Sequence, residues 1–270
     1  MNRESIFIEV EELRSRLEDS NIRLYDATII FFEIATDPTT AYEKYLQGHI
    51  PGAAFFDHDF FTDLDNKYEY MALPVTQLQE RIGRVGISQD SEIILYASGV
   101  LPAATRAWWL LRYAGHNNVR VLNGGLEAWT KAGGQLEQEP HIYEPTTFES
   151  EPRPAMFASK EEVLAAMEDE GICIEHTLTP EMYGGTYIPG STFVSVWDLM
   201  VKMDGFAPDD TFITRLQEIS SHKRIITYCG GGIAATINAI AHLIAGQENV
   251  AVYDGSLIEW MGEGLPVLKK

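Results

Sequence analysis

The strongest constraint on the fold is an internal repeat. Two segments of the chain, Gly115–Trp129 and Gly246–Trp260, match without a gap. Their identical pairs are Gly115/Gly246, Asn118/Asn249, Val119/Val250, Val121/Val252, Gly124/Gly255, Leu126/Leu257 and Trp129/Trp260. Further matches are Ile50-Pro51-Gly52 with Ile188-Pro189-Gly190, Tyr96 with Tyr228 and, allowing one inserted residue, Thr105 with Thr236. A period of about 130 residues is far longer than a solenoid unit, so the chain holds two copies of one domain fold.

Each copy alternates short apolar strands with helical patterns. In the first copy we expect helices at 10–17, 75–85 and 104–113, and strands at 23–27, 92–96 and 119–122. In the second copy we expect strands at 172–175, 225–229 and 250–253, and a helix at 234–245. Ser159, with Glu162 three residues later, predicts a further helix start. This alternation predicts an α/β fold in which each domain has a parallel sheet flanked by helices on both faces.

A proline-rich stretch separates the two copies. Pro140, Pro145, Pro152 and Pro154 lie in or beside residues 141–154, which show little periodicity. We therefore expect a first domain at 1–140, a linker at 141–157 and a second domain at 158–270.

A reactive cysteine is predicted where a strand meets a glycine-rich loop. The apolar run 225–227 leads into Tyr228-Cys229, three glycines follow, and the helical pattern then begins. Glycine lets several backbone N–H groups face one point, and a helix N-terminus adds partial positive charge there. Such surroundings lower the pKa of a thiol and activate the thiolate. We predict Cys229 as the nucleophile and a cradle of backbone amides from Gly230, Gly231, Gly232, Ile233, Ala234 and Ala235.

A buried structural thiol and a phosphate-binding loop are the simpler interpretations of such residues. Cys173 lies in Gly171-Ile-Cys-Ile, which is typical of a small buried apolar residue. A phosphate cradle of the nucleotide-binding kind is disfavoured, because neither G-x-G-x-x-G nor a Walker lysine is present.

Composition limits the partners. The formal net charge of −20 disfavours nucleic acid and anionic membranes, and no apolar run reaches the roughly 18 residues of a membrane span. The start, Met1-Asn-Arg-Glu-Ser, lacks the apolar core of a signal peptide. Two cysteines make no disulfide framework. We therefore expect a cytoplasmic protein that uses neither a cofactor nor a metal and binds neither nucleic acid nor membrane.

Several motifs in this order resemble the tandem rhodanese-like sulfurtransferases, the family of thiosulfate and 3-mercaptopyruvate sulfurtransferases. The resemblance covers nearly the whole chain. Its motifs are His49-Ile-Pro-Gly-Ala53, Met71-Ala-Leu-Pro74, Arg106-Ala-Trp-Trp-Leu-Leu111, Leu122-Asn-Gly-Gly-Leu126, Tyr253-Asp-Gly-Ser-Leu257 and the loop Cys229-Gly-Gly-Gly-Ile-Ala. The resemblance implies two rhodanese-like domains, of which the second is catalytic. The first is inactive, in agreement with Ala97 at the place of Cys229.

The chemistry that this implies is sulfur transfer through a Cys229 persulfide. The donor would be a small anion such as thiosulfate or 3-mercaptopyruvate. The acceptor would be cyanide or a thiol, with a thioredoxin-like protein as one candidate. A phosphatase of the dual-specificity type shares the fold but needs Cys-x5-Arg, and position 235 is Ala. A non-enzymatic persulfide carrier or partner-binding module remains the alternative.

The loop departs from both familiar substrate patterns. Members that prefer thiosulfate have basic side chains in it. Members that prefer mercaptopyruvate usually have Ser at the position of Gly231, and they carry arginines after the first strand of the second domain, which grip the carboxylate. Here the loop has no basic residue, and Thr177–Thr186 has neither Arg nor Lys. His176 is the candidate replacement, because imidazolium can pair with an anion, although a surface or capping histidine is an equal alternative. We expect Arg106 to brace the first copy's loop, and the family alignment makes Tyr70 and Asp57 candidates for facing the pocket.

Overall fold

A computed structural model describes residues 1–30, 39–179, 181–219 and 221–270. Within these ranges the chain forms two five-stranded parallel sheets with matching strand orders. The first sheet has the order β1-β5-β4-β2-β3, and the second has the order β6-β13-β12-β7-β9. Each strand of the first sheet has its counterpart at the same place in the strand order of the second. The sequence repeat is therefore a repeat of the fold.

The strands of the two sheets have the following bounds. The first sheet contains β1 (Phe7–Ile8), β2 (Ile22–Asp26), β3 (Ala54–Phe55), β4 (Glu92–Tyr96) and β5 (Val119–Leu122). The second contains β6 (Phe157–Ala158), β7 (Ile172–His176), β9 (Thr192–Phe193), β12 (Arg224–Tyr228) and β13 (Val250–Tyr253). Two small antiparallel pairs join β10 (Met200–Val201) to β11 (Gly205–Phe206) and β8 (Thr186–Tyr187) to β14 (Leu268–Lys269).

The helices lie between and around these strands. The α-helices are α1 (Val10–Ser15), α2 (Ala41–Gln47), α3 (Val75–Arg84), α4 (Leu101–Ala114), α5 (Gly125–Lys131), α6 (Lys160–Ala166), α7 (Asp209–Ile219), α8 (Ala235–Ile244) and α9 (Ser256–Gly262). Short 3-10 turns are η1 (Arg3–Ser5), η2 (Asp59–Phe61), η3 (Pro154–Met156), η4 (Met182–Gly185) and η5 (Val196–Leu199).

The elements expected from the sequence are found, several of them with shifted ends. The strands at 92–96, 119–122 and 250–253 are confirmed to the residue. Helix α4 begins at Leu101 rather than at 104, because Pro102 needs no N–H partner in the first turn of a helix. Strand β12 ends at Tyr228, one residue earlier than expected, so Cys229 belongs to the loop. Ser159 caps α6 as predicted, since its side chain accepts a hydrogen bond from the Glu162 N–H at 3.2 Å.

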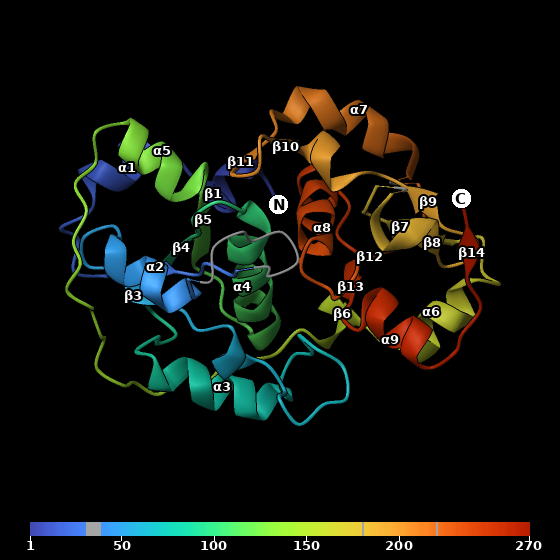
Figure 1. Cartoon of the computed structure of the whole chain (residues 1–270), viewed down its shortest axis with the longest axis horizontal. Helices are drawn as coiled ribbons and strands as arrows, with labels where there is room; N and C mark the ends of the chain where they lie inside the picture. The colour runs from blue at the N-terminus through green and yellow to red at the C-terminus, as the bar shows by residue number, and fades with distance from the viewer. Residues whose placement is uncertain (31–38, 180, 220) are drawn as a thin grey trace.

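Helices α4 and α8 pack against each other in the middle of the molecule, between the two sheets (Figure 1). The hydroxyl groups of Thr105 and Thr236, which matched in the repeat, lie 2.7 Å apart and are fully buried. Apolar side chains of both domains form one continuous cluster around these helices. The loops that precede α4 and α8 are therefore brought close to the domain interface.

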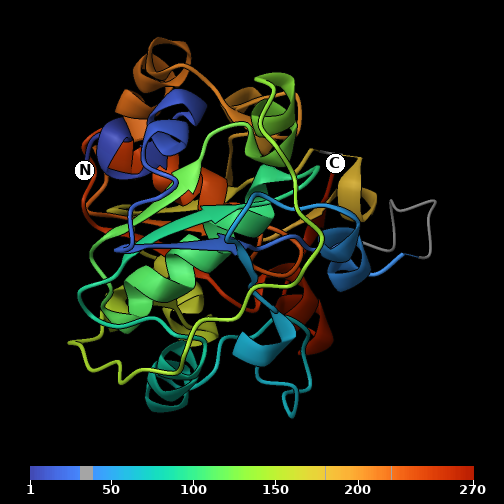
Figure 2. The ribbon, with the colours of Figure 1, turned by 90° about the vertical axis from the view of Figure 1, so that its left-hand side faces the viewer.

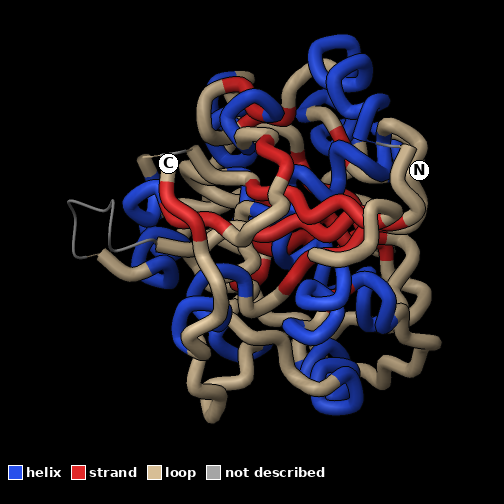
Figure 3. Tube along the Cα trace, turned by 90° about the vertical axis from the view of Figure 1, so that its right-hand side faces the viewer, coloured by secondary structure: helices blue, strands red, loops and turns tan. Residues whose placement is uncertain are grey.

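The second sheet is covered on both faces. Helix α8 packs on one face, and side chains of α6 and α9, including Val163 and Trp260, fill the core on the other. Figure 3, which views the molecule from the side of the second domain, shows these strands enclosed by helices. No helix in the described ranges has the length and apolar content needed to cross a membrane.

The segment expected to be a linker is fastened along the first domain (Figure 2). The Tyr143 hydroxyl donates to the Gly52 carbonyl at 2.8 Å and accepts from the Leu24 N–H at 3.0 Å. Further on, the Thr146 N–H donates to the Gly83 carbonyl at 2.8 Å. These hydrogen bonds hold the segment in a fixed position against the surface of the first domain.

Candidate active site

Cys229 lies between the end of β12 and the start of α8, as the sequence predicts. In the part of the chain that the structure describes, no hydrogen bond has a backbone amide of residues 230–235 as its donor. Amides at a helix N-terminus are left without intrahelical partners, and an anion is their natural acceptor. The loop therefore has the unoccupied donors that a cradle for an anionic sulfur requires.

Gly232 is the glycine that the loop most strictly requires. Its φ is +75°, and a Cβ there would lie 2.5 Å from the Asp254 carbonyl oxygen. A side chain at this position is excluded both by the left-handed backbone and by the close approach of the chain after β13. Gly230 and Gly231 are in different situations, because their neighbours are the aromatic side chains of Tyr183 and Tyr70.

The thiol of Cys229 is more deeply buried than is usual for a reactive cysteine. Cys229 is only 3% exposed. A Cβ on Gly230 would lie 2.0 Å from the Tyr183 hydroxyl, and a Cβ on Gly231 would lie 3.1 Å from Cδ2 of Tyr70. One tyrosine from each domain therefore packs against the loop. Both have positive φ, 53° at Tyr183 and 63° at Tyr70, which is uncommon for side chains of this size.

Ser256 holds the backbone of the nucleophile in place. The sequence analysis did not identify this residue. Its hydroxyl accepts a hydrogen bond from the Cys229 N–H at 3.1 Å and donates one to the Tyr253 carbonyl at 2.8 Å. Ser256 is fully buried and has a φ of +48°. The signal was present in the repeat, since the first copy has Gly125 at this position, where φ is also positive.

Arg106 does not brace the first copy's loop, as we expected. Its side chain reaches across the interface to the loop of the second copy. There it is 3% exposed, and a guanidinium nitrogen lies 2.7 Å from a carboxylate oxygen of Asp254. The guanidinium also donates to the carbonyls of Tyr70 at 2.7 Å and Gly232 at 3.3 Å. The packing of α4 against α8 explains the difference, because it turns this side chain toward the other domain.

His176 is placed where it cannot act as the expected cationic grip. Its ring is 1% exposed and packs against Tyr228 and Phe193, with centroid distances of 5.0 and 5.3 Å. Burial lowers the pKa of His176, so its ring is neutral near pH 7. Nδ1 lies 3.1 Å from the Leu178 carbonyl oxygen. A structural role at the end of β7 fits these contacts.

Of the two residues expected to face the pocket, Tyr70 does lie against the loop and Asp57 has a local role. The position of Tyr70 agrees with the alignment with the family. Asp57 accepts a hydrogen bond from the Asp59 N–H at 3.1 Å and so holds its own turn together.

Beneath α8, a buried carboxylate at Glu175 pairs with His242 at 2.9 Å and accepts a hydrogen bond from the Asn238 amide at 2.8 Å. These contacts fix the active-site helix to β7.

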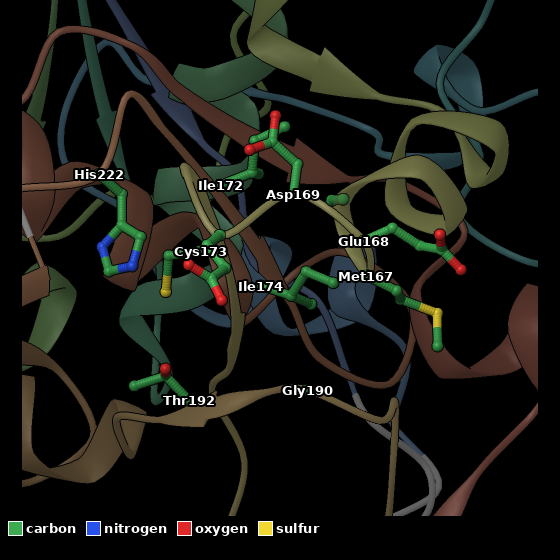
Figure 4. Close-up of a pocket in the computed structure, with 11 residues that line it drawn as sticks. Met167, Glu168, Asp169, Ile172, Cys173, Ile174, Gly190, Thr192 and His222 are labelled. Carbon is green, nitrogen blue, oxygen red and sulfur yellow. The ribbon is translucent and has the colours of Figure 1, made fainter.

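The second cysteine lies at a different place. Cys173 lines a cavity of about 450 Å³ between β7, the loop before it and His222 (Figure 4). Burial raises the pKa of the Cys173 thiol to about 11, so this thiol is protonated and unreactive at neutral pH. The remaining residues that line the cavity are Ala166, Met167, Glu168, Asp169, Glu170, Ile172, Ile174, Gly190 and Thr192.

Fold, repeat and loop together define a family. The model of the rhodanese-like domain matches the chain twice, at residues 9–132 and 159–263. The protein belongs to the rhodanese-like family and contains two such domains.

Relatives that match nearly the full length of the chain include sulfurtransferases. The chain is 30% identical to thiosulfate sulfurtransferase of Mus musculus, over 95% of this chain and 90% of that protein. It is 26% identical to 3-mercaptopyruvate sulfurtransferase of Homo sapiens, with the same coverage. The crystal structure of SseA from Escherichia coli, a 3-mercaptopyruvate sulfotransferase, superposes with a TM-score of 0.81 at 26% identity, covering 93% of this chain and 98% of SseA. Wild-type EanB shares the fold, with a TM-score of 0.85 at 19% identity over 99% of this chain and 70% of EanB.

Proposed function

We propose that the protein is a sulfurtransferase that moves a sulfane sulfur from a small anionic donor to a thiophilic acceptor through Cys229. The observation that carries the proposal is the loop after β12, where a thiol is followed by amides that find no acceptor among the described residues. The similarity to thiosulfate and 3-mercaptopyruvate sulfurtransferases supports it. In the first copy, Ala97 stands at the same place and offers no nucleophile.

The reaction has two displacements. In the first, the Cys229 thiolate attacks the outer sulfur of the donor. A sulfur–sulfur bond forms, and the bond between that sulfur and the rest of the donor breaks, with its electron pair leaving on the donor remainder. In the second, an acceptor such as cyanide, a small thiol or a thioredoxin-like protein attacks the outer sulfur of the persulfide. The Cys229 thiolate is then released, and no external oxidant or reductant is consumed.

The amides of residues 230–235 would stabilise the anionic persulfide between the two steps. Preorganised backbone donors of this kind act as an oxyanion hole does, and removing one donor in other enzymes costs about 2.7–4 kcal/mol of barrier. The loop itself has no basic residue. Recognition of the donor anion would therefore rest mainly on these neutral dipoles.

A persulfide carrier without turnover is the second candidate. It is favoured by the near-complete burial of Cys229, by the packing of Tyr183 against the adjacent Gly230, and by the lack of basic side chains in the loop. A carrier needs to accept one sulfur and keep it until a partner arrives. An enzyme must release it and bind the next donor.

The test uses thiosulfate and 3-mercaptopyruvate as donors and cyanide or a dithiol as acceptor. We expect repeated turnover with the native protein, and none with Cys229→Ala, because the attacking sulfur is gone. Cys173→Ala is the matched control and should retain turnover, since its thiol is buried away from the loop. Mass spectrometry should find one added sulfur on the peptide that contains Cys229. Uptake of that sulfur without turnover would favour the carrier, and native turnover by Cys229→Ala would contradict both.

A further inference from the structure

The first domain's loop already holds an anion, which comes from the protein itself. Glu127, in helix α5, accepts a hydrogen bond from the Gly99 N–H at 2.9 Å through Oε1. The same oxygen accepts a hydrogen bond from the Ser98 hydroxyl at 3.2 Å. Gly99 and Ser98 follow Ala97, the residue that matches Cys229. The inactive loop thus binds a carboxylate where the active loop would bind the sulfur donor.

The two loops can be compared directly because their backbones make the same contact. The Leu126 N–H donates to the Ala97 carbonyl at 3.1 Å, and the Leu257 N–H donates to the Cys229 carbonyl at 3.2 Å. Leu126 and Leu257 are an identical pair of the repeat. The next residue is Glu127 in the first copy and Ile258 in the second.

Ile258 lies against the active loop as Glu127 lies against the inactive one. Its N–H donates to the Gly230 carbonyl at 2.9 Å, and its Cδ1 would lie 3.2 Å from a Cβ on Gly231. Gly231 matches Gly99 when the loops are aligned from Tyr96 and Tyr228. A carboxylate on the side chain at 258 would therefore come within reach of the active loop's amides.

We propose that Ile258 is a specificity-determining residue that keeps the active loop available to an external anion, whereas Glu127 fills the matching loop of the first domain. The inference rests on the proposed function only in that the loop is meant for an anionic ligand. The nearby carboxylate of Asp254 does not compete, because Arg106 at 2.7 Å and the Ala72 N–H at 2.7 Å hold it.

The test compares Ile258→Glu with Ile258→Gln, which has nearly the same shape and no charge. Each variant is alkylated at Cys229 with iodoacetate, an anion, and with iodoacetamide, a neutral reagent of similar size. Mass spectrometry of the Cys229 peptide gives the two rates. Any change in the protonation or exposure of the thiol affects both reagents, so the ratio of the rates reports how the loop receives an anion.

We expect Ile258→Glu to lower the ratio of iodoacetate to iodoacetamide rates by at least about tenfold relative to Ile258→Gln, which corresponds to about 1.4 kcal/mol. The charge control is Glu127→Gln, which changes the net charge by one unit in the other domain. It should leave the ratio at Cys229 unchanged.

Equal ratios in Ile258→Glu and Ile258→Gln would overturn the proposal, and so would a native Cys229 that iodoacetate does not alkylate. Because alkylation needs no turnover, the two hypotheses can fail separately. A protein that transfers no sulfur but shows the expected ratios would refute the sulfurtransferase and retain the role of Ile258.

Discussion

At the scale of single residues, the active loop depends on a charge supplied by the other domain. Arg106 has no counterpart in the repeat, since the residue after Thr236 is Ile237. Its guanidinium holds both the side chain of Asp254 and the carbonyl of Gly232. The second of these contacts keeps a loop carbonyl facing away, toward α4. The first domain therefore supports the loop through a specific ion pair as well as through packing.

Replacing Arg106 should damage both stability and sulfur transfer. Arg106→Gln leaves the largely buried Asp254 carboxylate without its charged partner, which typically costs about 3–5 kcal/mol of unfolding free energy. The double variant Arg106→Gln, Asp254→Asn removes both charges and should lose less than the sum of the two single variants. Urea unfolding measures the stabilities, and cyanolysis of thiosulfate measures transfer. Strictly additive losses would show that the two side chains do not interact.

At the scale of elements, the turn η4 closes the site. Tyr183, Gly184 and Gly185 have φ values of 53°, 60° and 75°, three consecutive left-handed residues. This backbone is costly for tyrosine, yet it places the phenol ring directly over Gly230. The chain continues into β8, which pairs with β14 near the C-terminus. Tyr183 is thus held next to the active loop by a short element that is paired with the C-terminal strand.

Removing this ring should expose the thiol. We expect Tyr183→Gly to raise the rate of Cys229 alkylation by iodoacetamide by about tenfold, because the ring packed against the neighbouring Gly230 is lost and glycine adopts a positive φ freely. The comparison variant Tyr42→Gly removes an exposed ring from α2 and should leave the rate unchanged. If Tyr183→Gly reacts at the native rate, another group controls access to Cys229.

How much of this could be predicted depends on the kind of element. Strands β4, β5 and β13 were predicted to the residue, because each is an apolar run between clear breaks. The β10–β11 pair was missed, since two-residue strands leave no periodicity. The loop with Cys229 was found from its glycines, because strand, glycine and helix are local signals. Contacts between the copies, such as Arg106 with Asp254, could not be predicted, because they depend on how α4 meets α8.

At the scale of the whole molecule, both domains share one core, so protonation in one affects the stability of both. Two histidines of the first domain are buried and neutral. His116 accepts the Asn118 N–H at Nδ1 at 3.1 Å, and its Nε2 lies 3.2 Å from the Ser88 carbonyl. His58 has Nε2 at 3.0 Å from the Ala27 carbonyl. Desolvation lowers the pKa of each to about 4.

These two histidines predict a loss of stability in mild acid. In the unfolded chain their pKa is about 6.5, so between about pH 6.5 and pH 4 the unfolded state binds protons that the folded state does not. Their contribution is complete above that range and falls as the pH is lowered. We expect a loss of roughly 2–3 kcal/mol per histidine at about pH 4.5, measured by urea unfolding. Asp26 acts in the opposite direction, because burial raises its pKa.

The variant His116→Gln keeps a donor for Ser88 and cannot titrate, so its stability should depend less steeply on pH. An unchanged slope in this variant would mean that the His116 ring is already charged, or exposed to water, in the folded protein.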